Sequence, residues 1–159
     1  MQLPRLTTRA KVKRGAYALL ELGGFVTNRI PQMLSCAVYI LASRELGAKF
    51  VQYYVQIPAG ADTNDCFAKG ENDELFLYML EGSCMLETNG KAFHATENTY
   101  LYVPPSDGLS FQNESDAPAV FLLYKQKYIP LIGAEKPARI FQHVDDVKRE
   151  ISEHNPHSE

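Results

Sequence analysis

The densest group of potentially reactive side chains in this sequence is an acidic segment that contains a cysteine. It covers residues 62–74 and carries Asp62, Asp65, Cys66, Glu71, Asp73 and Glu74. Carboxylate oxygens are the ligands that hard divalent cations prefer, so this segment could bind a metal or close over a substrate. Carboxylates are also mostly solvent-exposed in proteins, and a solvated loop would have the same composition. The sequence favours a solvated loop, and a lid that binds a metal or covers a substrate is the alternative.

Nucleophilic catalysis by Cys66 would require a neighbouring base to remove the thiol proton. No histidine lies close to Cys66 in the sequence, so any base would have to come from a distant part of the fold. His94 falls inside a strand-like run and is expected on its surface rather than as a ligand. Three further histidines, which we expect to be structural, lie in the C-terminal region: His143, His154 and His157.

The elements that must position these side chains are strands. Runs rich in Val, Ile, Leu, Tyr and Phe, bounded by Gly, Pro and Asn, predict about eight short strands. They cover residues 37–41, 49–57, 75–80, 84–88, 91–95, 100–103, 109–113 and 119–128. Asn89-Gly90 between two of them predicts a tight hairpin, since both central residues of a type I′ turn need positive φ. This spacing indicates an all-β sandwich or small barrel.

The two ends of the chain differ in character from the strand-rich middle. We expect an irregular N-terminal arm over residues 1–35 that packs on the barrel, a barrel over residues 36–133, and a linker and tail over residues 134–159. Val144, Val147 and Ile151 follow helical spacing, which predicts a short helix in that last segment.

Composition narrows the classes of function. The chain has 159 residues, which fits one domain, and its net charge of −3 gives no basic excess for binding nucleic acid. The uncharged stretch over residues 30–43 is shorter than the roughly 20 residues that a membrane span needs. Cys36, Cys66 and Cys84 are odd in number and form no C-x-x-C pair. Free thiols in a reducing, cytoplasmic compartment are therefore expected.

Several segments resemble the cupin superfamily, and more closely the N-terminal cupin half of the (S)-ureidoglycine aminohydrolases. The resemblance rests on the ordered series of residues 46–53, 75–82, 100–105 and 121–131, with the opening residues 8–10 and 18–20. It implies a single cupin barrel, also called a double-stranded β-helix or jelly roll, with a short C-terminal linker or helix. It also implies a place in allantoin breakdown and purine degradation.

The family that this chain resembles is built from two cupins, and it removes ammonia from ureidoglycine with a bound divalent metal, usually manganese. The resemblance places the metal ligands in the second cupin, whereas this chain matches the first. We therefore expect no cofactor and no catalytic residue in this chain alone. We expect its partner to be a second cupin domain or further copies of itself, because an open cupin sheet has edges to cover.

The cupin metal motifs can be tested directly on this sequence. Metal-binding cupins supply two His and a Glu from one motif and a third His from a second, on strands that converge on one ion. With Gly82 as the last glycine of the first motif, Leu75 occupies the Glu position; Leu109 occupies the His position of the second motif. With the Gly82 anchor, no ligand position holds a donor except Glu71 in one of the two spacings that the motif allows. Counting forward from Gly60 instead places Cys66 and Ala68 at the two His positions, so neither alignment supplies two ligands.

The side-chain alternation of the strands supports the same expectation. Leu75, Leu77 and Met79 share one face of a strand, and Leu109 and Phe111 share a face of another. If these faces point inward, the barrel centre is apolar and cannot replace the hydration shell of a dication. We predict that the lining of the barrel mouth or of any pocket includes these residues: Cys66, Glu71, Glu74, Leu77, Met79 and Phe111.

Two hypotheses of function remain open at this point. In the first, the chain is a structural cupin that holds a catalytic cupin in an assembly. In the second, it stands alone as a small-molecule binder or as a hydrolase of a ureide-type C–N bond.

Overall fold

The computed structural model describes residues 11–20 and 24–148 of the chain. His154, His157, Ile151 and residues 8–10, which the sequence analysis discussed, lie outside these described residues. Twelve strands are present in the described part, and all eight predicted strands are among them. The strands are β1 Lys11–Lys13, β2 Tyr17–Leu19, β3 Thr27–Asn28, β4 Ala37–Ala42, β5 Phe50–Ile57, β6 Asp73–Glu81, β7 Ser83–Thr88, β8 Lys91–Thr96, β9 Thr99–Val103, β10 Ser110–Gln112, β11 Ala119–Lys127 and β12 Ile140–His143.

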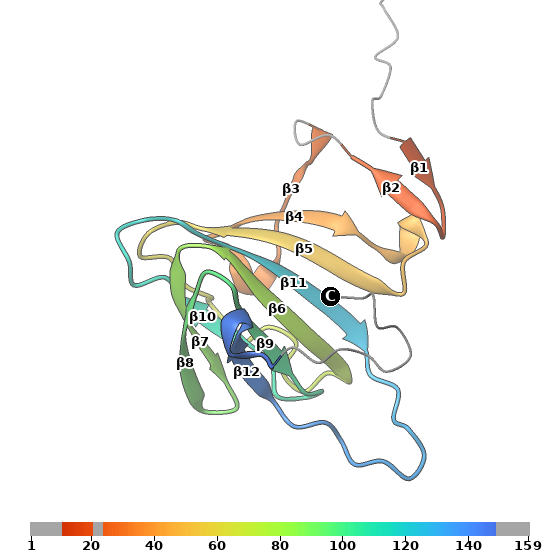
Figure 1. Ribbon diagram of the computed structural model, residues 1–159. Coiled ribbons are helices and arrows are strands. Elements are labelled where there is room, and N and C mark those ends of the chain that lie inside the picture. Colours follow the sequence, from red (N-terminus) through yellow and green to blue (C-terminus); the bar gives the residue numbers. More distant parts are fainter. Residues whose placement is uncertain (1–10, 21–23, 149–159) are drawn as a thin grey trace, which may run out of the picture.

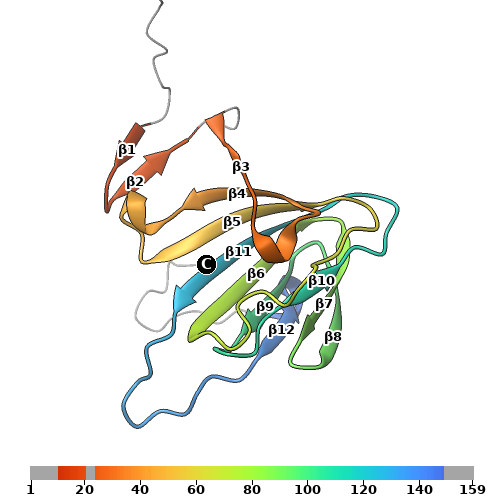
Figure 2. The same cartoon turned by 180° about the vertical axis from the view of Figure 1, so that it is seen from behind.

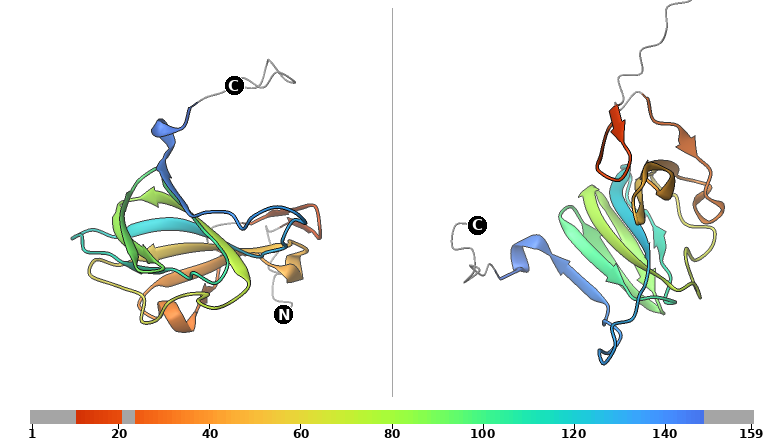
Figure 3. Two further views of the ribbon diagram at one scale, coloured as in Figure 1. Left: turned by 90° about the horizontal axis from the view of Figure 1, so that it is seen from below. Right: turned by 90° about the vertical axis from the view of Figure 1, so that its right-hand side faces the viewer.

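Two antiparallel sheets face each other and enclose the core (Figure 1). The larger sheet has seven strands in the order β12-β9-β6-β11-β5-β4-β3, and the smaller has three in the order β10-β7-β8. The views from behind, from below and from the right-hand side show the same two layers, with the β1–β2 hairpin set apart from them (Figures 2 and 3). The all-β, jelly-roll class predicted from the sequence is therefore confirmed.

Strict alternation of apolar residues builds the interior. Along β6, the side chains of Leu75, Leu77 and Met79 are at most 1% exposed, while their neighbours point to the outer face. Phe121 and Leu123 of β11 are fully buried beside them, because β11 pairs with β6 in register. Burying large aliphatic and aromatic side chains contributes about 1.5–3 kcal/mol each, so these rows are the main source of stability.

The predicted hairpin at residues 89–90 is confirmed. Asn89 has φ of 48° and Gly90 has φ of 70°, so both central residues occupy the left-handed region that a type I′ turn needs. The turn fixes the pairing of β7 with β8, in which Leu86 lies opposite Phe93.

A buried asparagine closes the loops at the end of β10. Asn113 is fully buried, and its amide nitrogen donates to the carbonyl oxygens of Ile57, Pro58 and Ala117 at 2.8–3.1 Å. Its carbonyl oxygen accepts from the Ser115 amide and hydroxyl. This fully bonded polar side chain joins the loop after β5 to the loop between β10 and β11, and its hydrogen bonds offset the cost of burying it.

The large sheet extends beyond residues 36–133 at both ends. β3 pairs with β4, and β12 pairs with β9 through Ile140–His143, a segment expected to be linker. The Phe141 ring lies 4.7 Å from the ring of Phe93, and a guanidinium nitrogen of Arg139 donates to the Thr88 carbonyl at 2.8 Å. These contacts with the small sheet hold the segment as a strand.

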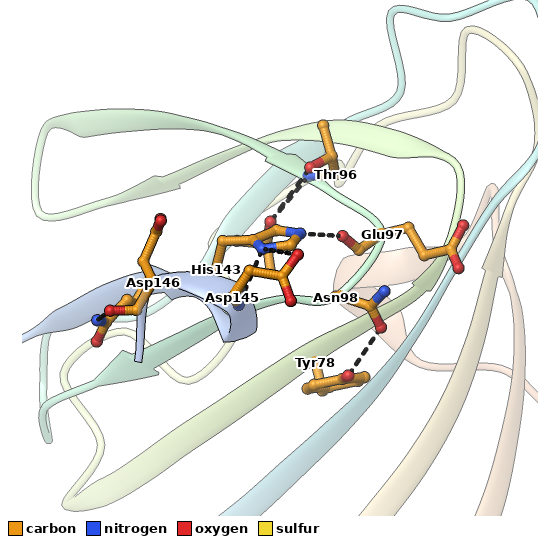
Figure 4. A network of polar contacts seen from close by, with 9 residues as sticks. Tyr78, Thr96, Glu97, Asn98, His143, Asp145 and Asp146 are labelled. Atoms are coloured by element: carbon orange, nitrogen blue, oxygen red, sulfur yellow. Dashed lines mark hydrogen bonds and ion pairs between the residues drawn. The ribbon is translucent and has the colours of Figure 1, made fainter. Parts of the chain in front are cut away.

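The short helix expected around Val144 and Val147 is instead a single 3₁₀ turn, Val144–Asp146. His143 caps this turn: its Nδ1 accepts from the Asp145 amide at 3.2 Å, and its Nε2 lies 3.1 Å from the Glu97 carbonyl oxygen (Figure 4). The Asn98 carbonyl oxygen accepts from the Val144 amide. Val147 already has extended backbone angles, so the chain leaves the turn there.

We predict that a histidine placed in the core will destabilise the fold, whereas a histidine at an exposed position three residues further along the chain will not. Leu109 is fully buried, so Leu109→His should lower the free energy of unfolding by about 1–3 kcal/mol, because it buries unpaired ring nitrogens. Gln112→His, at an exposed position, is the matched control. Urea denaturation monitored by circular dichroism measures both, and equal stability of the two variants would contradict the placement of Leu109.

Candidate functional site

One end of the barrel interior carries charged side chains, whereas its centre is apolar. It lies where β5 and β6 begin and β11 ends, and we call this end the barrel mouth (Figure 1). The inward row of β6 ends at Asp73, and the inward row of β11, which starts with Phe121 and Leu123, continues to Lys125. Tyr53 is the corresponding inward residue of β5 and lies opposite Leu123. Three neighbouring strands therefore direct a carboxylate, an ammonium group and a phenol to one place.

Lys125 is the centre of this cluster. Its ammonium forms ion pairs with the carboxylates of Glu71 and of Asp73, the latter at 3.3 Å, and it lies 5.1 Å from the centre of the Phe67 ring. Burial lowers the pKa of Lys125, but the hydrogen bond and charge of Glu71 and the charge of Asp73 outweigh it, so this pKa stands above its usual value. The amine is therefore protonated at neutral pH, which excludes Lys125 as a nucleophile and suits it to hold an anion.

Tyr53 forms the floor of the barrel mouth. Its side chain is 9% exposed, and its ring packs edge-on against Phe67 with the ring centres 5.9 Å apart. Burial raises the pKa of Tyr53, although the charge of Lys125 lowers it in part. The hydroxyl is therefore a hydrogen-bond donor rather than a phenolate at neutral pH.

The residues that face the barrel centre do not include the His and Glu donors of the cupin metal motifs. The residues that face it include Leu75, Leu77, Met79, Leu109 and Phe111, each at most 2% exposed. Carbon side chains cannot replace the water ligands of a manganese ion, and the sulfur atoms of Met79 and Cys84 in the core are too soft for it. Within residues 11–20 and 24–148, no three His, Cys, Asp or Glu side chains gather as metal ligands would.

The residues predicted to line the mouth or a pocket fall in different places. Glu71 lies at the barrel mouth, paired with Lys125. Leu77, Met79 and Phe111 belong to the packed core, where Phe111 contacts Phe121 edge-on at 5.1 Å between ring centres.

Glu74 and Cys66 lie apart from the barrel mouth. Glu74 points to the outer face of the large sheet, where it accepts a 2.7 Å hydrogen bond from the Tyr102 hydroxyl. Burial, and then this bond, raise the pKa of Tyr102. Cys66 is half-buried in the loop before β6, packed so closely on Gly108 that a Cβ there would lie 2.6 Å from its sulfur.

The sequence reasoning did not assign Lys125 and Tyr53 to a site. The alternation of side chains along each strand could have identified them. Lys125 lies four residues after Phe121 and Tyr53 lies two residues before Val55, so each points to the same side of its strand as a buried residue.

The comparisons with known proteins agree with this architecture. A protein identified as (S)-ureidoglycine aminohydrolase from Escherichia coli strain K12 is 38% identical over 128 residues, which cover 80% of this chain and 49% of that enzyme. The crystal structure of protein Ylba from E. coli superposes with a TM-score of 0.83 at 35% identity, covering 92% of this chain and 60% of that one.

A more distant structure shows the fold alone. The cupin domain of Cnp3 from Schizosaccharomyces pombe superposes with a TM-score of 0.56 at 16% identity, covering 69% of this chain and 73% of that domain. No family model matches the sequence.

The chain has the cupin fold and is similar to one half of (S)-ureidoglycine aminohydrolase. It spans about half the length of this curated relative. The helices of the cupin, within the described residues, include none that is long and apolar enough to cross a membrane.

A second feature of this cupin lies on the opposite face of its large sheet. Register places Tyr100, Tyr78, Leu122, Tyr54 and Tyr39 in one straight row across the five strands β9, β6, β11, β5 and β4. All five side chains are half-buried. A second row lies beside the first, formed by Tyr102, Phe76, Tyr124 and Gln52. We call these two rows the outer aromatic face.

The outer aromatic face is accompanied by other uncovered apolar side chains. On the β1–β2 hairpin, Val12, Tyr17 and Leu19 are about half or more exposed, and in the loop after β11, Leu131 and Ile132 are largely exposed. A hollow of about 730 Å³ separates the arm from the sheet and is lined by residues that include Phe25, Tyr39 and Tyr54. Contiguous exposed apolar surface of this kind is typical of an interaction site.

We predict that the three thiols of this cupin will differ sharply in reactivity. Burial raises the pKa of Cys84 to about 12, and its sulfur lies 3.7 Å from that of Met79 in the core. Iodoacetamide at about pH 8 should therefore modify half-buried Cys66 in the native chain and leave Cys84 unmodified, because only thiolates react. Peptide mass spectrometry measures each site, with the guanidinium-unfolded chain as control. Modification of Cys84 at the rate of the unfolded chain would contradict its placement in the core.

Proposed function

We propose that this chain is an assembly cupin: a cupin without a catalytic centre that holds a catalytic cupin in a ureidoglycine aminohydrolase-like protein. The observation that carries the proposal is the barrel centre, where Leu75 and Leu109 stand at the positions of metal ligands and are packed without exposure. The match to one half of an aminohydrolase also supports the proposal. A partner of similar size would correspond to the other half and would carry the catalytic centre.

The outer aromatic face supplies a surface on which such a partner could pack. Its rows cross five strands, and tyrosine rings bury large area while their hydroxyls remain hydrogen-bonded at the rim. The Tyr100 hydroxyl donates to Gln142 and the Tyr78 hydroxyl donates to Asn98, both at 2.9 Å, so the polar tips are held in place. A preorganised apolar face of this kind costs little entropy to cover.

The occupant that we propose for this face is the cupin domain that corresponds to the unmatched half of the E. coli relative. The chain covers 49% of that enzyme, so a segment of about equal length completes it. The β1–β2 hairpin adjoins the same surface, since Tyr17 of the hairpin and Gln52 of the second row line one hollow. The proposal also includes action in ureide breakdown in the cytoplasm, which is consistent with three unpaired cysteines.

We predict that the purified chain will neither hold a metal nor release ammonia on its own. Elemental analysis after dialysis should find far less than one Mn, Ni, Zn or Fe per chain, because the barrel centre lacks donors. Incubation with ureidoglycine should release no ammonia above the uncatalysed rate. One tightly held metal ion per chain, or turnover by the chain alone, would overturn the assembly role and favour the stand-alone enzyme.

We further predict that a charge on the outer aromatic face will prevent assembly. The chain is co-expressed with the unmatched half of the E. coli relative, and the complex is measured by size-exclusion chromatography with light scattering. Leu122→Glu, in the centre of the first row, should abolish a complex that the unchanged chain forms, because an unpaired carboxylate would be buried. His94→Glu, at an exposed position of β8 in the small sheet, is the control that should still assemble.

The same experiment separates the alternatives. Ammonia release that appears only in the complex supports the proposal. A complex that survives Leu122→Glu unchanged, or a chain that forms only copies of itself through this face, would refute it.

A further inference from the structure

A hollow on the outer face of the large sheet combines aromatic rings with one carboxylate. It has a volume of about 250 Å³ and lies over the starts of β5 and β6 and the ends of β9 and β11. Its lining includes the side chains of Phe50, Glu74, Phe76, Tyr102, Tyr124 and Gln126, so it overlaps the second row of the outer aromatic face. We call it the acidic aromatic hollow.

The rings of the acidic aromatic hollow are inclined to one another and form its walls. The centre of the Tyr124 ring lies 5.8 Å from that of Phe50 and 6.1 Å from that of Phe76, at interplanar angles of 54° and 55°. Phe76 is 37% exposed, so part of its ring remains open to a bound group. The electron-rich face of an aromatic ring attracts cations. These walls therefore favour a cation over an anion.

Glu74 gives the acidic aromatic hollow a negative charge. Its carboxylate accepts a 2.7 Å hydrogen bond from the Tyr102 hydroxyl, but that phenol stays neutral, because burial and then the bond to Glu74 raise its pKa. Gln126, which lies opposite Glu74 on β11, is also uncharged. Within the described part of the chain, no Lys, Arg or His forms an ion pair with Glu74.

Covering the outer aromatic face would take the Glu74 carboxylate out of water. The proposed function places a partner cupin on this face, and the present inference rests on that proposal. A charge that is buried without a counter-charge strongly destabilises a complex. A partner that packs on this face must therefore bring a cation to Glu74.

We propose that the partner cupin inserts an arginine side chain into the acidic aromatic hollow, with its guanidinium paired to the Glu74 carboxylate and stacked against the rings of Phe76 and Tyr124. The volume of about 250 Å³ is below the roughly 300–1,000 Å³ of sites for drug-sized ligands, so it suits a single side chain. A guanidinium fits better than an ammonium, because it is planar, weakly hydrated and able to donate a fork of N–H groups to one carboxylate.

Titration of the full chain with three probes tests the chemistry of the site without the partner. N-acetyl-arginine amide should give saturable chemical-shift changes in ¹H–¹⁵N spectra, centred on residues of the acidic aromatic hollow. N-acetyl-citrulline amide, a neutral molecule of nearly the same shape, should give none, and N-acetyl-lysine amide should bind more weakly than the arginine probe. No saturable change with the arginine probe, equal changes with the citrulline probe, or tighter binding of the lysine probe would each overturn the assignment.

Variants of the same chain assign the two parts of the site. Glu74→Gln should weaken the arginine probe about tenfold, because a hydrogen-bonded charge pair is lost. Its melting temperature should not change, since the amide oxygen can still accept from Tyr102. Phe76→Leu should weaken the probe about threefold, because it removes a ring from the wall. Glu87→Gln, at an exposed position of β7 in the small sheet, is the matched control and should bind as the unchanged chain does. Unchanged affinity in Glu74→Gln or in Phe76→Leu would refute the site.

The complex with the unmatched half of the E. coli relative tests the occupant. Glu74→Gln should weaken this complex about thirtyfold or more, because the partner's guanidinium would be left buried without its counter-charge, whereas Glu87→Gln should not weaken it. If the complex forms and Glu74→Gln leaves its affinity unchanged, only the arginine contact is refuted. If the unchanged chain forms no complex, the assembly role is refuted and this occupant with it.

Discussion

The structure depends on one constraint: the interior between the two sheets is filled by side chains that alternate along each strand. Leu75, Leu77 and Met79 from β6 meet Phe121 and Leu123 from β11 with essentially no exposure. These side chains offer carbon atoms and one thioether sulfur to the interior, so this part of the centre is apolar. The stability of the fold and the apolar character of the centre therefore have the same physical origin.

The same alternation determines what faces outward. Each inward apolar residue of β6, β11 and β5 is followed by an outward one, and register then lines up Tyr78, Leu122 and Tyr54 across strands. Where the inward rows pass the end of the core they become polar, at Asp73, Lys125 and Tyr53. The outer aromatic face and the barrel mouth are thus two consequences of one pattern, on opposite sides of the sheet.

Much of the fold could be predicted from the sequence, because strand periodicity and the Asn89-Gly90 turn are local signals. The apolar placement of Leu75, Leu77, Met79, Leu109 and Phe111 followed from the same period and is confirmed. β12 could not be predicted, since Ile140–His143 becomes a strand only through pairing with β9. The partners of Lys125 could not be predicted either: Glu71 lies 54 residues away, and only the folded loop brings it near.

The row of tyrosines on the outer aromatic face has a spectroscopic consequence. The chain contains nine tyrosines and no tryptophan, so its near-ultraviolet emission comes from phenol rings alone. Six of those rings, at residues 39, 54, 78, 100, 102 and 124, belong to the two rows or their neighbouring positions on that face. Unmodified protein therefore carries a built-in fluorophore array concentrated on one side, and quenching by iodide would report directly whether that side is wet or covered.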